Sequence, residues 1–83
     1  MKYMVAELLH TASKAWYEDG KICIEMTDGS EFRFPVHLNK RLANATQEQR
    51  SVIEVTCGGT GLHWPEIDED LSVIGIIEGR YGH

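Results

Sequence analysis

The sequence has little of several features that define common protein classes. No apolar run approaches the ~20 residues that a helix needs to span a membrane, and Glu7 and His10 interrupt the start where a secretory signal would need a long apolar stretch. With 8 basic against 13 acidic residues, the net charge is −5, and no basic surface of the kind that binds nucleic acid is visible. We therefore expect a cytoplasmic protein with no direct contact to membrane or nucleic acid.

Cysteine is also scarce, because Cys23 and Cys57 are the only two in 83 residues. This number does not make a disulfide scaffold, and in the cytoplasm both are expected to stay reduced, each as a small strand residue. The length predicts a single domain over residues 1–83 with a thin core. A core of this size leaves little room for an enclosed catalytic pocket.

Two Asp-Gly pairs predict β-hairpins, because each lies beside alternating apolar residues. In the second hairpin, a three-residue loop over 27–29 places Ile24 opposite Phe32. The same loop places Ile22 opposite Phe34, so the apolar side chains share one face. A two-residue loop would divide them between the two faces, and we therefore predict the longer loop, with its glycine in the left-handed conformation.

Coarser patterns surround the hairpins. The segment 15–17 should pair with the strand that follows the first Asp-Gly, whereas 5–10 fits either a strand or a helix. Leucines four residues apart predict a short helix near 38–43, and a capping box that begins at Thr46 predicts another near 47–51.

The second half predicts a further strand, a short strand that contains Leu62 and Trp64, and a C-terminal helix. The β-branched stretch 51–57 is typical of a strand, and Ser72 is a good N-cap for a helix near 72–79 that Gly79 would end. The fold class is therefore α+β, a small antiparallel sheet of three to five strands with short helices.

The glycines of residues 57–72 invite a phosphate-loop interpretation, but no lysine follows Gly58, Gly59 and Gly61, and they do not open directly into a helix. They favour a bend between strand segments, or a bulge. Trp64 should lie in the core and Pro65 should end its strand.

His63 is the residue of this stretch without an evident structural task. It can meet Asp68 or Asp70, either as an acid–base or metal-binding pair or as a hydrogen bond that braces the turn, and the bracing interpretation is favoured. The acidic run 68–70 is expected to lead into the following helix. The histidine spacing matches no zinc motif, so we predict no catalytic residue, metal or cofactor.

The stretch from Gly58 to Arg80 resembles the signature of a bacterial family known as domain of unknown function 2442. That signature is a glycine-rich bend, His-Trp-Pro, acidic residues, Asp-Leu-Ser-Val and a short glycine-containing helix. The matching positions here are His63, Trp64, Pro65, Asp68, Asp70, Leu71, Ser72, Val73 and Gly75. The upstream half fits as well, although Gln47 stands where the family tends to have proline.

The resemblance implies a small α+β domain with an antiparallel sheet and no established enzymatic activity. Members are often encoded beside another small protein, in an arrangement that looks like a toxin–antitoxin pair. Some relatives carry the domain in front of a helix-turn-helix. Since the sequence ends at His83, we expect no such DNA-binding domain after it.

We therefore expect a non-enzymatic protein that binds another protein, in an antitoxin-like or accessory role, with the product of a neighbouring gene as partner. Trp16 and Tyr17 would form an edge patch for this partner if they are exposed, and Lys40 and Arg41 would meet an acidic patch on it. Free sheet edges also predict self-association, as in a homodimer. The alternative is a small metal-binding or hydrolytic enzyme centred on His63.

Overall fold

The computed structural model describes residues 11–82 of the chain, so the segment 5–10 lies outside the described residues. The first sheet has the order β1-β2-β3 and is antiparallel throughout; its strands are β1 (Ala12–Glu18), β2 (Lys21–Met26) and β3 (Glu31–Pro35). The segment 15–17 pairs with β2, as predicted.

The predicted register of the second hairpin is confirmed. Ile24 lies opposite Phe32, and Ile22 lies opposite Phe34. Gly29 has a φ of 91°, a conformation that side-chain-bearing residues rarely adopt, and it closes the predicted three-residue loop. Segregation of apolar side chains onto one face therefore decided the register, even though it sets Glu25 opposite Glu31.

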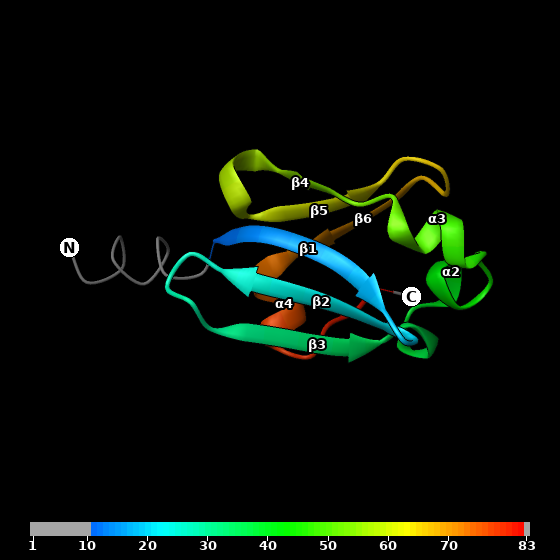
Figure 1. Ribbon diagram of the computed structural model, residues 1–83, viewed down its shortest axis with the longest axis horizontal. Helices are drawn as coiled ribbons and strands as arrows, with labels where there is room; N and C mark the ends of the chain where they lie inside the picture. The colour runs from blue at the N-terminus through cyan, green and yellow to red at the C-terminus, as the bar shows by residue number, and fades with distance from the viewer. Residues whose placement is uncertain (1–10, 83) are drawn as a thin grey trace.

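Short helices connect the first sheet to a second one, of order β4-β5-β6. The connection contains η1 (Val36–Leu38), α2 (Lys40–Ala43) and α3 (Gln47–Ser51). The second sheet contains β4 (Glu54–Thr56), β5 (Gly61–Trp64) and β6 (Glu69–Ser72), with the turn η2 (Cys57–Gly59) before β5 and the helix α4 (Val73–Ile77) after β6. The fold is α+β, with two small antiparallel sheets and a C-terminal helix (Figure 1).

The core lies between the two sheets, with α4 behind the first sheet in Figure 1. Buried side chains from both sheets, η1, α2 and α4 make one cluster: Ala12, Ile22, Ile24, Met26, Phe34, Val36, Leu42, Leu62, Trp64, Leu71, Val73 and Ile76. The predicted caps of α3 and α4 are present, since Thr46 and Gln49 form a reciprocal capping box and Ser72 accepts a bond from the backbone of Gly75. No helix among residues 11–82 is both long enough and apolar enough to cross a membrane.

Three local expectations were wrong. The strand expected over 51–57 covers only Glu54–Thr56, because Ser51 still belongs to α3. The acidic run does not lead into a helix: Glu69 and Asp70 begin β6 and pair with β5. Cys57 is not a strand residue, since it is exposed in η2 with a φ of 53°.

Candidate functional site

The most open surface of the fold is the side of the first sheet that faces away from the core, which we call the outer face. It carries the side chains of Lys14, Trp16 and Glu18 on β1, of Lys21, Cys23 and Glu25 on β2, and of Glu31, Arg33 and Pro35 on β3. Within residues 11–82, no helix or strand crosses this face (Figure 1). Apart from the buried Cys23, its side chains are therefore not covered by any helix or strand of the described residues.

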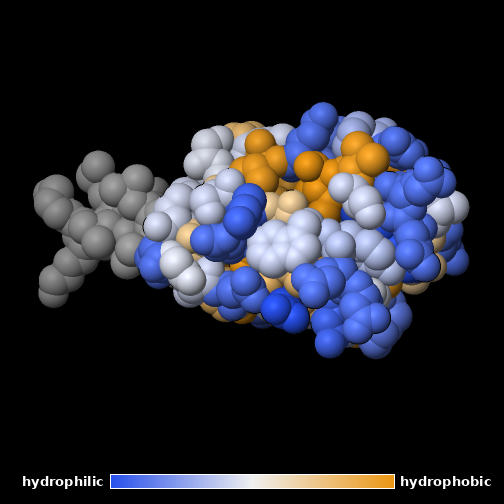
Figure 2. Space-filling view, viewed as in Figure 1, coloured by the Kyte–Doolittle hydropathy of each residue, from blue (hydrophilic) through white to orange (hydrophobic). Residues whose placement is uncertain are grey.

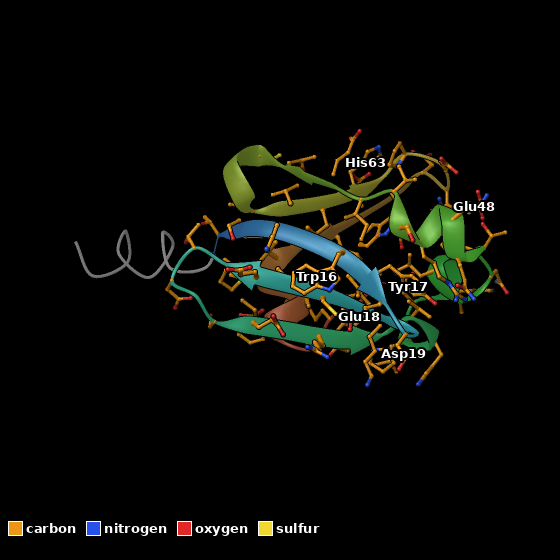
Figure 3. All side chains as sticks on the ribbon, viewed as in Figure 1. Trp16, Tyr17, Glu18, Asp19, Glu48 and His63 are labelled. Atoms are coloured by element: carbon orange, nitrogen blue, oxygen red, sulfur yellow. The ribbon has the colours of Figure 1, made fainter. Side chains whose placement is uncertain are left out.

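Trp16 lies at the centre of the outer face and is partly exposed (Figures 2 and 3). Its indole Nε1 donates to a carboxylate oxygen of Glu18 at 2.9 Å. The ammonium of Lys14 lies 5.7 Å from the centroid of the ring, within the range of a cation–π interaction. These two contacts restrain the indole, so an aromatic surface is presented in a defined orientation.

The charges of the outer face balance, with three basic and three acidic side chains among its residues. Lys14 pairs with Glu25 at 3.2 Å, and Arg33 pairs with Glu31 at 3.0 Å. Exposed pairs of this kind add little stability, but they remove net charge. The charge of −5 on the whole chain therefore comes from other parts of it.

Cys23 is fully buried although it belongs to the outer face. Its cross-strand neighbours are Trp16 on one side and Arg33 on the other, so their side chains flank the thiol on the same face. Burial raises the pKa of the Cys23 thiol, and the positive charge of Arg33 opposes this shift only in part. The burial of a β2 side chain beneath its neighbours shows how densely the centre of the outer face is filled.

Tyr17 does not share a patch with Trp16, because adjacent residues of a strand point to opposite faces. Its ring packs against the core, and its hydroxyl accepts a bond from Arg50 Nη1 at 3.3 Å. The Arg50 guanidinium also lies 5.7 Å from the centroid of the ring. The edge patch predicted from these two aromatic residues is thus reduced to Trp16.

Apolar surface continues from the outer face toward β4, which lies beside β1 (Figure 2). Val52, just before β4, and Val55 within it are 38% and 37% exposed. Large apolar side chains exposed next to a partly exposed tryptophan are typical of protein contact surfaces. Sequence patterns did not find this extension, because Val52 and Val55 look like ordinary strand residues.

His63 meets Asp70 and not Asp68. Its Nδ1 lies 2.8 Å from a carboxylate oxygen of Asp70, the residue directly opposite on β6. The Asp70 side chain is 73% exposed, whereas Asp68 occupies the turn with a φ of 53°. Among residues 11–82, no three His, Cys, Asp or Glu side chains gather closely enough to hold a metal ion.

The glycine-rich bend serves the turn between β4 and β5. Gly58 and Gly59 have φ values of 64° and 97°, and a Cβ on Gly59 would lie 2.8 Å from the backbone oxygen of Ala12. A Cβ on Gly61 would lie 2.7 Å from the hydroxyl oxygen of Thr56. The bend therefore brings the second sheet against β1.

Trp64 and Pro65 follow the predicted pattern around this bend. Trp64 is fully buried, and its Nε1 donates to the backbone oxygen of Arg50 at 3.2 Å. Pro65 comes directly after the last residue of β5. This part of the motif thus anchors the sheet to α3.

Three of the four lysine and arginine side chains from Lys40 onward have partners within the protein. Arg41 donates to the backbone oxygens of Ile67 and Asp68, and Arg80 pairs with Glu78. Arg50 donates to the backbone of α2 at Leu42 and Ala43; together these bonds tie α2 to α3. Lys40 and Arg41 line a hollow between α2, α3 and the turn after β5.

Asn39 is a structural residue that sequence analysis did not single out. It is fully buried, its amide nitrogen donates to Glu69 at 2.7 Å and to the backbone oxygen of Tyr81 at 2.6 Å, and its amide oxygen caps α2 at Leu42. An Asn before a helix signals a cap, but no local signal reveals the two distant partners.

Comparison with known proteins identifies the family. Residues 12–82 match the family described as protein of unknown function (DUF2442). The chain belongs to this family. The resemblance predicted from the His-Trp-Pro and Asp-Leu-Ser-Val segments is therefore confirmed.

Solved structures with the same fold come from two bacteria. A protein of unknown function from Rhodospirillum rubrum is 33% identical, with a TM-score of 0.82 over 88% of this chain and 90% of that chain. An uncharacterised protein from Chromobacterium violaceum is 29% identical, with a TM-score of 0.81 over 98% of this chain and 76% of that chain. No curated protein matches the sequence. These relatives support the fold and assign no activity.

Proposed function

We propose that this protein acts by binding another protein through the outer face of the first sheet, with Trp16 at the centre of the contact. The observation that carries the proposal is a restrained, partly exposed tryptophan on a sheet face that no element of residues 11–82 covers. Tryptophan is enriched among the residues that dominate binding energy at protein interfaces. A ring of paired charges around it matches the polar rim of such interfaces.

The charge balance of the outer face defines the chemistry of the partner. A strongly basic partner would bind to the acidic parts of the chain outside this face. The outer face has no net charge, so it suits a partner surface that is also close to neutral. The partner should present an aliphatic or aromatic side chain to the Trp16 indole and polar groups to the paired charges around it. Val52 and Val55 extend the apolar part of the contact toward β4.

The specific role we propose is that of an antitoxin-like or accessory member of a two-gene bacterial module, with the neighbouring gene product as partner. The family membership supports this role only through the gene arrangement expected of its members. In such a module, the small protein holds its partner in a complex and needs no active site of its own.

The test is capture of the partner from the native host with two variants of the full chain. Trp16→Thr removes the indole and keeps a residue that favours strands. Ile74→Ala is the matched control, because Ile74 is 38% exposed on α4, on the opposite side of the first sheet. A partner identified by mass spectrometry is then purified, and its binding to both variants is measured by calorimetry.

The proposal predicts that the Trp16→Thr change weakens binding by at least about tenfold, the usual effect of losing a central aromatic contact, while Ile74→Ala binds like the parent. Equal binding of both variants would exclude the outer face as the contact. Recovery of only a second copy of the chain would indicate self-association and contradict a heterologous partner. Recovery of no protein would contradict a protein partner of either kind.

A further inference from the structure

The hollow beside α2 and α3 has no role in the contact proposed above. It has a volume of about 480 Å³, and its lining residues are Lys40, Arg41, Asn44, Ala45, Gln49 and Ile67. This volume is in the range of ligand-binding clefts. Two cations, two amides and two apolar side chains thus meet at one place on a chain whose net charge is −5.

Arg41 is held in place by the protein itself. Its Nη1 donates to the backbone oxygens of Ile67 and Asp68, at 3.2 and 2.7 Å. The described residues provide no partner for its Nε and Nη2, which form the edge of a guanidinium that receives a carboxylate through two parallel bonds. Because one side of the group is already fixed, binding an anion on the other side costs little conformational entropy.

Lys40 adds a second positive charge next to this edge. Among residues 11–82, its ammonium has no ion-pair or hydrogen-bond partner, in contrast to Lys14, Arg33 and Arg80. Glu48 on α3 is not among the lining residues, so the hollow contains no acidic side chain. The hollow is therefore the one place where the described structure presents an unpaired lysine beside a half-open arginine.

We propose that the hollow binds an acidic side chain carried by a peptide segment of a protein partner. Ala45 and Ile67 give the hollow an apolar portion that suits an aliphatic residue next to the acid, and Asn44 and Gln49 can bond the peptide backbone. A free inorganic anion would use the two cations and leave the apolar portion empty. This inference rests on the proposed function in that the ligand is a protein, but it concerns a separate surface.

The test is an NMR titration of the full chain with a pair of short peptides. One peptide contains Leu-Glu-Glu-Leu between Gly-Ser ends, and the other replaces both glutamates with glutamine. We expect saturable shifts of the amides of Lys40, Arg41, Asn44 and Gln49 with the acidic peptide, and about tenfold weaker binding of the glutamine peptide, since charge-assisted bonds are lost. Binding should also weaken when the salt concentration is raised from 0.05 to 0.5 M, because exposed charges are screened.

Two variants locate the site, and a third serves as the control. Lys40→Met and Arg41→Gln should each reduce affinity for the acidic peptide by about tenfold. Lys40→Met is the decisive change, because Arg41 also supports the turn after β5, whereas Lys40 makes no such contact. Arg80→Gln removes a cation that is paired with Glu78 at the other end of the chain, and it should bind the peptide like the parent.

The outcomes separate this inference from the proposed function. Shifts centred on Trp16, or equal binding of both peptides, would overturn the acidic-peptide site and leave the outer face as the only contact. Saturation by sodium phosphate or acetate at the same concentration as the peptide would show a site for free anions and would also overturn it. Retained peptide binding by the Trp16→Thr variant, together with its loss in Lys40→Met, would support the hollow even if no partner binds the outer face.

Discussion

The two sheets of this protein are held in different ways. In the first sheet, strands of five to seven residues follow one another through tight turns, and the hydrogen bonds run between neighbours in sequence. In the second, strands of three or four residues depend on contacts from elsewhere. Asn39 holds β6 through Glu69, Arg50 holds β5 through Trp64, and Gly59 sits against β1.

The two sheets therefore differ in where their large side chains point. The second sheet points the tryptophan of the His-Trp-Pro segment inward, since Trp64 is buried and its indole donates to the backbone of Arg50. The first sheet is specified by its own turns and by the apolar residues of its inner face, so its register does not depend on the residues of the outer face. Substitutions at matched residues of the two sheets test this difference.

The two tryptophans should differ most. Trp64→Ala removes a fully buried indole from the second sheet and should lower the free energy of unfolding by about 4 kcal/mol. Trp16→Thr removes a partly exposed indole and should cost about 1 kcal/mol. Urea denaturation followed by circular dichroism measures both, and equal costs would contradict the division between anchor and surface.

Asn39 provides the next test, because it connects η1 and α2 to the second sheet. Asn39→Ala removes a helix cap and two bonds made in the interior, and we expect a loss of about 3 kcal/mol. Asn44→Ala is the control, since it removes an exposed side chain of the same kind at the end of α2 and should cost less than about 0.5 kcal/mol. A thermal melt that moves equally in both variants would argue against the anchor.

Gly29 in a turn of the first sheet and Gly59 in a turn of the second both have a positive φ, and their substitution compares the two sheets directly. Gly59→Ala introduces a strained residue whose Cβ also meets the backbone of Ala12 at 2.8 Å, so it should cost about 3 kcal/mol. Gly29→Ala meets only the conformational strain, because nothing lies within 4 Å of its Cβ, and it should cost about 1 kcal/mol. Hydrogen exchange should show loss of protection centred on β4 and β5 in the Gly59→Ala variant. Similar losses of unfolding free energy in the two variants would mean that the turn at Gly59 is not closely packed against β1.

The sequence predicted most of the first sheet because its information is local. The pair Asp28-Gly29 and the alternation of Ile22, Ile24, Phe32 and Phe34 determine both the turn and the register. The buried position of Trp64 and the cap at Ser72 were predicted for the same reason. Each depends on residues within a few positions of one another.

The second sheet was predicted less well because its determinants are distant. Glu69 and Asp70 look like the acidic lead-in to a helix, yet they form β6 by pairing with β5. The amide of Asn39, 30 residues upstream, also donates to the Glu69 carboxylate. The bonds from the Arg50 guanidinium to the backbone of α2 likewise have no local signal in the sequence. For the candidate site, the sequence grouped Trp16 and Tyr17 in one patch, although adjacent residues of a strand point to opposite faces.

The most direct test of the free outer face is alkylation of Cys23, whose thiol is buried there between Trp16 and Arg33. Iodoacetamide labelling, followed by peptide mass spectrometry, compares it with the exposed Cys57 in the same molecule. In the parent protein, Cys23 should react far more slowly, because it is inaccessible and burial raises its pKa, which reduces the reactive thiolate. In the Trp16→Thr variant, Cys23 should react at least about tenfold faster while Cys57 is unchanged. An equally slow reaction in a folded Trp16→Thr variant would show that something other than the indole covers this face, and would contradict the account.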